Sequence, residues 1–179
     1  ALDAARKWEA AAKGYQDRRQ EAMAVNSQGI SRWHLGQQEE ALAAYRAALT
    51  LVEGANFPDV EGDILNNLGM LYHEMGDLDR SLEYLSQALE ISDEDRNPEG
   101  LGHTLNSIGL VYRELNQLET AMEYLNRAYI IHRRTDNRRG MADALNNMGV
   151  IYQQQGRADL ALQYYRQSVQ LEEELNNRA

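Results

Sequence analysis

The hydrophobic residues of this chain follow two helical stripes that recur at a fixed distance. In one copy, Leu65, Leu68 and Tyr72 share one face of a helix, with the spacing i, i+3, i+7. After Gly76 a second stripe of helical spacing runs through Leu78, Leu82, Leu85 and Leu89. The pattern predicts two amphipathic helices joined by a tight turn at the glycine, because glycine readily adopts the left-handed conformation that ends a helix.

The same pattern returns every 40 residues. Two columns are identical in all copies: Gly29, Gly69, Gly109 and Gly149, and Asn26, Asn66, Asn106 and Asn146. A third column holds the residues that separate the two helices of each copy: Gly36, Gly76, Asn116 and Gly156. Repetition at this period predicts an array of stacked helical units, each burying its apolar face against the next.

The chain is therefore expected to form one all-α array over residues 1–179 with about nine helices. The first is a helix of the second type over about 1–15, in a partial repeat 1–19. Four helix pairs follow: about 20–35 with 38–54, 59–75 with 78–94, 99–115 with 118–134, and 139–155 with 158–176. The corresponding repeats cover about 20–58, 59–98, 99–138 and 139–179. Asn97 and Pro98 are expected to cap and begin the third pair.

These columns resemble the tetratricopeptide repeat (TPR), whose first helix carries an aliphatic residue, Leu-Gly and Tyr, and whose second helix carries small residues around a Leu or an aromatic residue. The second copy supplies Leu65, Leu68, Gly69, Tyr72, Ser81, Leu85 and Ala88. The 40-residue form is similar to the Leu-Gly-Asn repeat proteins and to TPR arrays of bacterial regulators. The resemblance implies a right-handed superhelical solenoid that acts as a non-catalytic protein–protein interaction scaffold. The first copy departs from the pattern at Gln28 and Arg32.

A second face of each first helix points away from the packed stripe, and in a stacked array these faces line a concave groove. We expect a partner peptide to bind there. The candidate groove residues are Asn26, Asn66, Asn106 and Asn146; Asp63, His103 and Asp143; Met70, Leu110 and Val150; and His73 and Arg113. The remaining members of these columns are Met23, Ile30, Trp33 and Gln153, and one further column holds His34, Glu74, Glu114 and Gln154.

The four groove asparagines, which we term the asparagine ladder, allow two interpretations. A side-chain amide offers donors and an acceptor that match the backbone of an extended peptide, and the family resemblance implies that role. Alternatively, the amides bond to neighbouring repeats and brace the superhelix. The apolar strip of Ile30, Met70, Leu110 and Val150 is similarly either a contact line for a ligand or a surface shielded by the adjoining repeat.

The composition and charge of the chain limit the classes of molecule that it is expected to bind. The chain has 18 Lys and Arg against 28 Asp and Glu, a net charge of −10, which disfavours nucleic acid. No apolar run is long enough for a membrane span. Cysteine is absent, as is typical of a reducing compartment, so we expect a cytoplasmic protein. The groove carries the carboxylates Asp63, Asp143, Glu74 and Glu114 against the single formal cation Arg113, which favours a neutral or basic peptide.

No catalytic or cofactor motif is found. The four histidines have no HExxH spacing, and no phosphate-binding loop or nucleophile elbow occurs. His34 and His73 come from neighbouring copies and could approach across the groove, but ordinary groove lining accounts for them. We expect no enzyme, no cofactor and no metal. The alternative to a peptide-binding scaffold is a self-association or regulatory module that controls an output domain of a larger protein.

Overall fold

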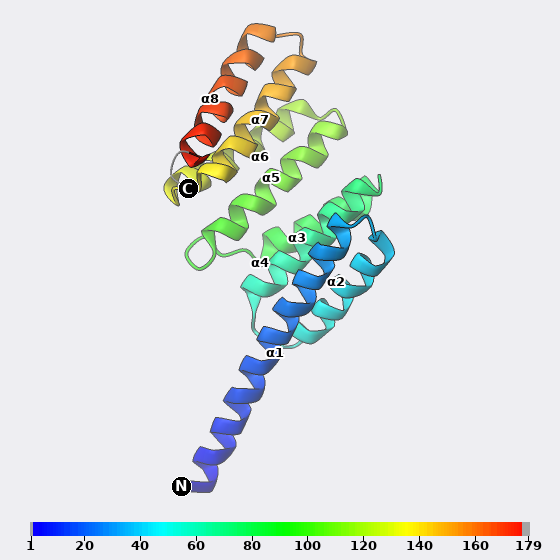
Figure 1. Ribbon diagram of the computed structural model, residues 1–179, viewed down its shortest axis with the longest axis vertical. Coiled ribbons are helices and arrows are strands. Elements are labelled where there is room, and N and C mark those ends of the chain that lie inside the picture. Colours follow the sequence, from blue (N-terminus) through cyan, green and yellow to red (C-terminus); the bar gives the residue numbers. More distant parts are fainter. Residues whose placement is uncertain (1, 177–179) are drawn as a thin grey trace.

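Over residues 2–176 the computed structural model is entirely helical, with eight helices (Figure 1). They are α1 (Leu2–His34), α2 (Gln38–Val52), α3 (Pro58–Glu74), α4 (Leu78–Ile91), α5 (Pro98–Glu114), α6 (Leu118–Arg134), α7 (Arg138–Gln154) and α8 (Ala158–Asn176). Side chains are described for residues 14–175. Ala1 and residues 177–179, which belong to the predicted array, lie outside the described residues. The helices form four antiparallel pairs, α1–α2 to α7–α8, as the 40-residue period predicts.

One continuous helix, α1, replaces the two helices expected over 1–15 and 20–35. The helix continues through Gly14, the counterpart of Gly54, because Arg18 stands where Pro58 begins α3 one repeat later and residues 16–19 contain no proline. Two junctions between pairs turn at a left-handed residue, Gly54 (φ 70°) and Asp136 (φ 52°). The first part of α1 therefore continues in line and projects from the stacked helices (Figure 1).

The turns inside the pairs are built as the sequence predicts. The four separating residues have left-handed backbones: Gly36 (φ 73°), Gly76 (φ 79°), Asn116 (φ 59°) and Gly156 (φ 73°). This conformation brings the next N–H back to the helix end, where Asp77 N–H donates to Tyr72 C=O at 2.9 Å. The predicted cap is also present: Asn97 Oδ1 accepts from Gly100 N–H at 2.9 Å, and α5 begins at Pro98.

The helices of each pair meet at the invariant glycine of the first helix. A Cβ placed on Gly109 would lie 2.7 Å from Leu125 Cγ and 3.2 Å from the backbone oxygen of Ala121. The glycine at Gly69 faces Leu85 in the same way, at 2.6 Å. Since such distances exclude a side chain, the close approach of the paired helices requires glycine at this column.

Tyrosine contacts join the two helices of the last three pairs; the rings are stacked in Tyr72–Tyr84 and Tyr112–Tyr124 and tilted by 39° in Tyr152–Tyr164. The ring centroids are 5.4 Å apart for Tyr72–Tyr84, 5.5 Å for Tyr112–Tyr124 and 5.0 Å for Tyr152–Tyr164. The first pair has Arg32 and Ala44 at these two columns. The first helix pair thus lacks both tyrosines of this contact, and its departure from the family pattern affects the two helices together.

The glycine contact predicts opposite effects of one substitution at two helical positions. We expect Gly109→Ala to lower the free energy of unfolding by about 1–3 kcal/mol, because the new methyl group overpacks the α5–α6 contact. Gly14→Ala in α1, where no atom lies within 4 Å of the added Cβ, should raise it by up to about 1 kcal/mol through helix propensity. Urea unfolding of both variants tests this, and equal stabilisation by both would contradict the packing argument.

Candidate binding groove

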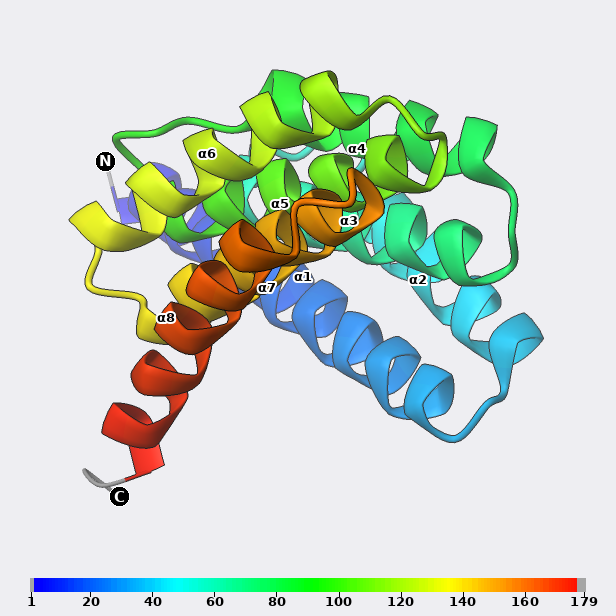
Figure 2. The same cartoon turned by 90° about the horizontal axis from the view of Figure 1, so that it is seen from above.

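The first helices of the pairs form a continuous layer. Among the described residues α1 contacts α3, α3 contacts α5 and α5 contacts α7, whereas no second helix contacts another second helix. Successive repeats are therefore closer together at their first helices than at their second helices. Because of this difference the array curves, and the side formed by the first helices is concave. Figure 2 shows α1, α3, α5 and α7 gathered along this side, with α2, α4 and α6 outside them.

The apolar strip of the groove remains partly open to solvent. Ile30, Met70, Leu110 and Val150 are each partly buried, and Ile30 packs against the core formed by α1, α2 and α3. The adjoining repeats shield part of each side chain and leave the rest facing the groove. An apolar line of this kind can contact a ligand.

Two members of the asparagine ladder bond to the next repeat. Asn67 Nδ2 donates to Asn26 Oδ1 at 3.0 Å, and Asn147 Nδ2 donates to Asn106 Oδ1 at 3.5 Å. We term these two bonds the amide bridges. In each of them the ladder residue uses its oxygen and not its NH2 group.

The amide bridges occur at alternate junctions because the partner column itself alternates. It holds Ser27, Asn67, Ser107 and Asn147. Sequence reasoning missed this column, although an asparagine that follows a ladder asparagine in every second copy was a readable signal. Where serine stands, Asn66 Oδ1 is buried with no hydrogen-bond partner among the described residues.

The charged groove residues pair across the repeats. Trp33 Nε1 donates to Glu74, and Arg113 donates to Asn147 Oδ1 at 2.8 Å. His73 Nε2 lies 3.1 Å from Glu114 Oε2, without hydrogen-bond geometry. Glu74 and Glu114 therefore each lie beside a side chain of the preceding repeat, and both glutamates and the two aspartates contribute negative charge to the groove.

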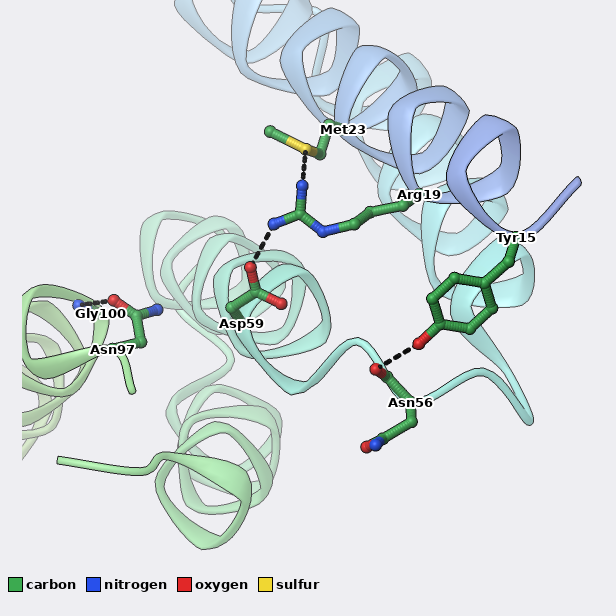
Figure 3. A network of polar contacts seen from close by, with 7 residues as sticks. All are labelled: Tyr15, Arg19, Met23, Asn56, Asp59, Asn97 and Gly100. Atoms are coloured by element: carbon green, nitrogen blue, oxygen red, sulfur yellow. Dashed lines mark hydrogen bonds and ion pairs between the residues drawn. The ribbon is translucent and has the colours of Figure 1, made fainter. Parts of the chain in front are cut away.

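The outer column of the groove holds Asp63, His103 and Asp143, all with exposed surface. Partial desolvation and the charge of Asp59 raise the pKa of Asp63 to about 6, against the opposing charge of Arg19. Desolvation also lowers the pKa of His103 and raises that of Asp143, and the attraction between these two groups opposes both shifts. Figure 3 shows Arg19 between Met23 of this column and Asp59, to which its guanidinium donates.

A buried histidine behind this column has no counterpart in the predicted site. His132 of α6 is 0% exposed and packs against Gly102 and Gly140. Its ring centroid lies 5.0 Å from that of His103, and neither ring nitrogen has a hydrogen-bond partner among the described residues. Burial, aided by the nearby His103, lowers the pKa of His132 to about 4.

The other two histidines serve as groove lining. His34 stacks beside Trp33, with centroids 6.1 Å apart, and His73 faces Glu114 of the next repeat. Within the described part of the chain, no group of three or more histidine and acidic side chains is arranged to hold a metal ion.

The repeat columns and the helix pairs agree with a known family. The sequence profile of the tetratricopeptide repeat matches residues 19–94, 60–134 and 101–174. The chain belongs to this family. The predicted resemblance is thereby confirmed, and the TPR assignment covers the four complete helix pairs.

Solved structures confirm the TPR solenoid. BtubC (BKLC) from P. vanneervenii is 22% identical with a TM-score of 0.72, covering 94% of this chain and 73% of its own. Aspartyl phosphate phosphatase F from Bacillus subtilis is 16% identical with a TM-score of 0.79, covering 89% and 42%. The Cut9–Hcn1 structure of the APC/C is 21% identical with a TM-score of 0.71, covering 84% and 26%. No curated protein sequence matches the chain.

The TPR architecture supports a protein-interaction scaffold, as expected from the sequence. The family is generally non-catalytic. None of the helices in the described range has the length and apolar character required to span a membrane.

The buried His132 predicts a loss of stability in acid. Its folded-state pKa of about 4 lies below the ordinary 6.5, so the unfolded chain binds the proton first as the pH falls. The stabilisation is complete above about pH 6.5 and is lost progressively toward pH 4, by up to about 3 kcal/mol. The measurement is the free energy of unfolding of wild type minus that of His132→Phe, from pH 4 to 7.5.

Asp63 and Asp143 have raised pKa values, which make the folded protein more stable as the pH falls, opposite to the effect of His132. Both aspartates are present in wild type and in the variant, so their contributions cancel in the difference. Two parallel pH profiles would show that His132 is not the group responsible.

Proposed function

We propose that the chain is a non-catalytic scaffold that captures an extended or helical peptide of a partner protein in its concave groove. The observation that carries this proposal is the apolar strip, which crosses all four first helices and keeps exposed surface in each. Met70, Leu110 and Val150 anchor apolar side chains of the peptide. One structural neighbour, Cut9, is itself described in a complex with another protein, Hcn1, which supports a role in protein assembly.

The asparagine ladder supplies bonds to the peptide backbone. Asn26 and Asn106 keep their NH2 groups as donors, because the amide bridges use only their oxygens. Asn66 Oδ1 is a buried acceptor without a partner in the described structure, and a peptide N–H would satisfy it once the side chain turns toward the groove. Asn146 lies exposed at the last repeat. Bracing and binding are therefore compatible functions of the same column.

The charged columns select the peptide. Asp63 and Asp143 present carboxylates at the outer edge of the groove, beside His103, and favour a neutral or basic partner. His73 and Arg113 lie at the opposite edge, where their contacts with Glu114 and Asn147 leave them oriented along the groove. These positions vary between copies and so give the peptide a direction and a register.

Simultaneous replacement of Asn66, Asn106 and Asn146 by alanine should weaken peptide binding by about tenfold or more, because each lost backbone hydrogen bond costs about 1 kcal/mol. Peptides selected from a displayed library against the wild-type protein serve as ligands, with affinity measured by fluorescence anisotropy. Unchanged affinity in a variant of normal melting temperature would contradict the groove proposal.

A matched control separates binding from bracing. Asn67→Ser removes the amide bridge to Asn26 by introducing the residue that the chain itself uses at Ser27 and Ser107, and it leaves the Arg113–Asn147 contact intact. This control should lower the melting temperature and leave the peptide affinity within about twofold. If its affinity falls as far as that of the alanine variant, the ladder acts through stability alone.

Self-association is the second candidate function, and one feature of α8 favours it. Leu162 is 48% exposed and Val169 is 51% exposed. The equivalent residues of the preceding repeats, such as Leu82 and Leu89, pack in the core. The last pair thus presents an apolar face that every earlier pair buries, and a second copy of the array could cover it.

Light scattering over a range of protein concentrations tests this candidate. If the α8 face self-associates, mass should rise with concentration, and Leu162→Glu with Val169→Glu should return the protein to a monomer. Gln163→Glu with Gln167→Glu adds the same charge at other exposed positions of α8 and should leave the association intact. A monomer at all concentrations would eliminate self-association of the array.

A further inference from the structure

A pocket of about 300 Å³ opens between the first turns of α3 and α5 and the end of α4. Gly62, Ser92 and Gly100 line it, and Asp63 of the groove forms part of its wall. Figure 3 shows one edge of this region, with Asp59 on α3, its carboxylate directed toward Arg19, and with Asn97 and Gly100 at the start of α5. The pocket therefore adjoins the outer column of the groove.

The equivalent place one repeat later is filled by an aromatic ring. There the residues are Gly102, His132 and Gly140, each 40 positions after its counterpart in the pocket. A Cβ on Gly102 would lie 2.6 Å from His132 Cε1, and one on Gly140 would lie 2.4 Å from His132 Nδ1. The two glycines thus make room for the imidazole.

The pocket keeps the two glycines but has no ring. A Cβ on Gly62 would meet nothing closer than Ile91, at 4.0 Å, whereas one on Gly100 would clash with the Asn97 side chain that caps α5. The open space therefore lies at Gly62. Serine at position 92 is much smaller than histidine, and the space that the third repeat gives to an imidazole is left open in the second.

One repeat earlier the same place is filled in another way. Ala22, Val52 and Val60 occupy the three equivalent positions and are 0%, 1% and 4% exposed. The chain therefore closes this site with aliphatic groups at the first junction and with a ring at the third. Only the middle of these three junctions leaves it open, within the described residues.

The lining of the open site consists mainly of hydrogen-bond acceptors. Asp59, Asp63 and Asp93 contribute carboxylates, and Arg96, the cation of the pocket wall, lies 3.3 Å from Asp93. Thr104 is 2% exposed and also lines the pocket.

The carboxylates decide the sign of the ligand. The N-termini of α3 and α5 contribute about +0.5 charge each and the C-terminus of α4 about −0.5. Arg19 pairs with Asp59, and Arg96 lies beside Asp93. With the helix-end partial charges, these two cations leave a small negative excess, which Asp63 carries. The pocket therefore favours a cation. A planar group that only donates hydrogen bonds matches the space that an imidazole fills one repeat later, and it matches the acceptors of the wall.

The rim already holds such a group from within the chain. The guanidinium of Arg19 reaches Asp59 from α1 (Figure 3). Asp63 receives no such bond, and the raised pKa of its carboxyl reflects desolvation and the charge of Asp59. A second cation in the pocket would compensate for this crowding of negative charge.

We propose that the pocket receives the guanidinium of an arginine side chain from the bound partner, packed against Gly62 as the imidazole of His132 packs against Gly102, with the Asn97 side chain covering Gly100 on the other side. The inference rests on the proposed peptide-binding function and specifies its partner as an arginine-containing peptide. Lysine, a compact charge without the planar fork, fits the space less well.

The pocket is tested with the short peptide acetyl-Gly-Arg-Gly-amide, followed by backbone NMR shifts. Saturable shifts are expected at Gly62, Gly100 and Thr104. The same peptide with citrulline, a neutral isostere of arginine, should bind about tenfold more weakly or worse, since it lacks the charge-assisted bonds. The lysine peptide should also bind more weakly than the arginine peptide. Equal binding of the citrulline peptide would overturn the proposal.

Variants of the chain supply the matched test. Ser92→His and Ser92→Val copy the fillings found at His132 and Val52, and both should abolish the shifts without lowering the melting temperature. Asp63→Asn should weaken binding about tenfold, whereas Asp95→Asn, an exposed loop residue outside the lining, should have no effect. Retained binding in a folded Ser92 variant would also overturn the proposal.

This test is independent of the groove test. The Asn66, Asn106 and Asn146 alanine variant should still bind the arginine tripeptide, because no ladder residue lines the pocket. If the tripeptide fails to bind wild type while the alanine variant still loses its library-selected ligands, the pocket proposal is wrong and the groove proposal stands. If the tripeptide binds wild type while the alanine variant keeps its affinity for the library-selected ligands, the groove proposal is wrong and the pocket proposal stands.

Discussion

The close approach of two helices at one glycine is the constraint on which the rest of the structure depends. At Gly69 and Gly109 the partner helix comes within 2.6–2.7 Å of where a Cβ would be, and the same column recurs in every pair. This approach fixes the spacing of the pair and brings the tyrosines into stacking distance. It also directs the opposite face of each first helix toward the concave side, so the groove follows from the packing of the pairs.

The sequence predicts most of this architecture because each packing position recurs in every repeat, so that the helical pattern can be recognised in several copies. Helix boundaries, the left-handed turns at Gly76 and Asn116 and the cap at Asn97 all depend on local backbone preferences that single residues reveal. The first helix was not predicted correctly, because the expected break rested on phase with later repeats and residues 16–19 contain no proline. Periodicity indicates where a break would be useful, but local chemistry decides whether it forms.

The candidate site was less accessible from sequence. The columns that line the groove follow from helical periodicity alone, but their contacts depend on the distance between neighbouring helices. The amide bridge from Asn67 to Asn26 spans 41 positions, and the pairing of Trp33 with Glu74 also crosses a junction. His132 is an ordinary helical residue until the two glycines packed against it are known from the fold.

The alternation of the amide bridges has a mechanical consequence. The first and third junctions each carry a bridge and a filled interior, whereas the second has the unpaired Asn66 oxygen and an unfilled pocket. Helices α3 and α5 still contact each other directly, as the first helices do at the other two junctions. The second junction lacks both side-chain restraints, so its geometry depends more heavily on the packing of α3, α4 and α5.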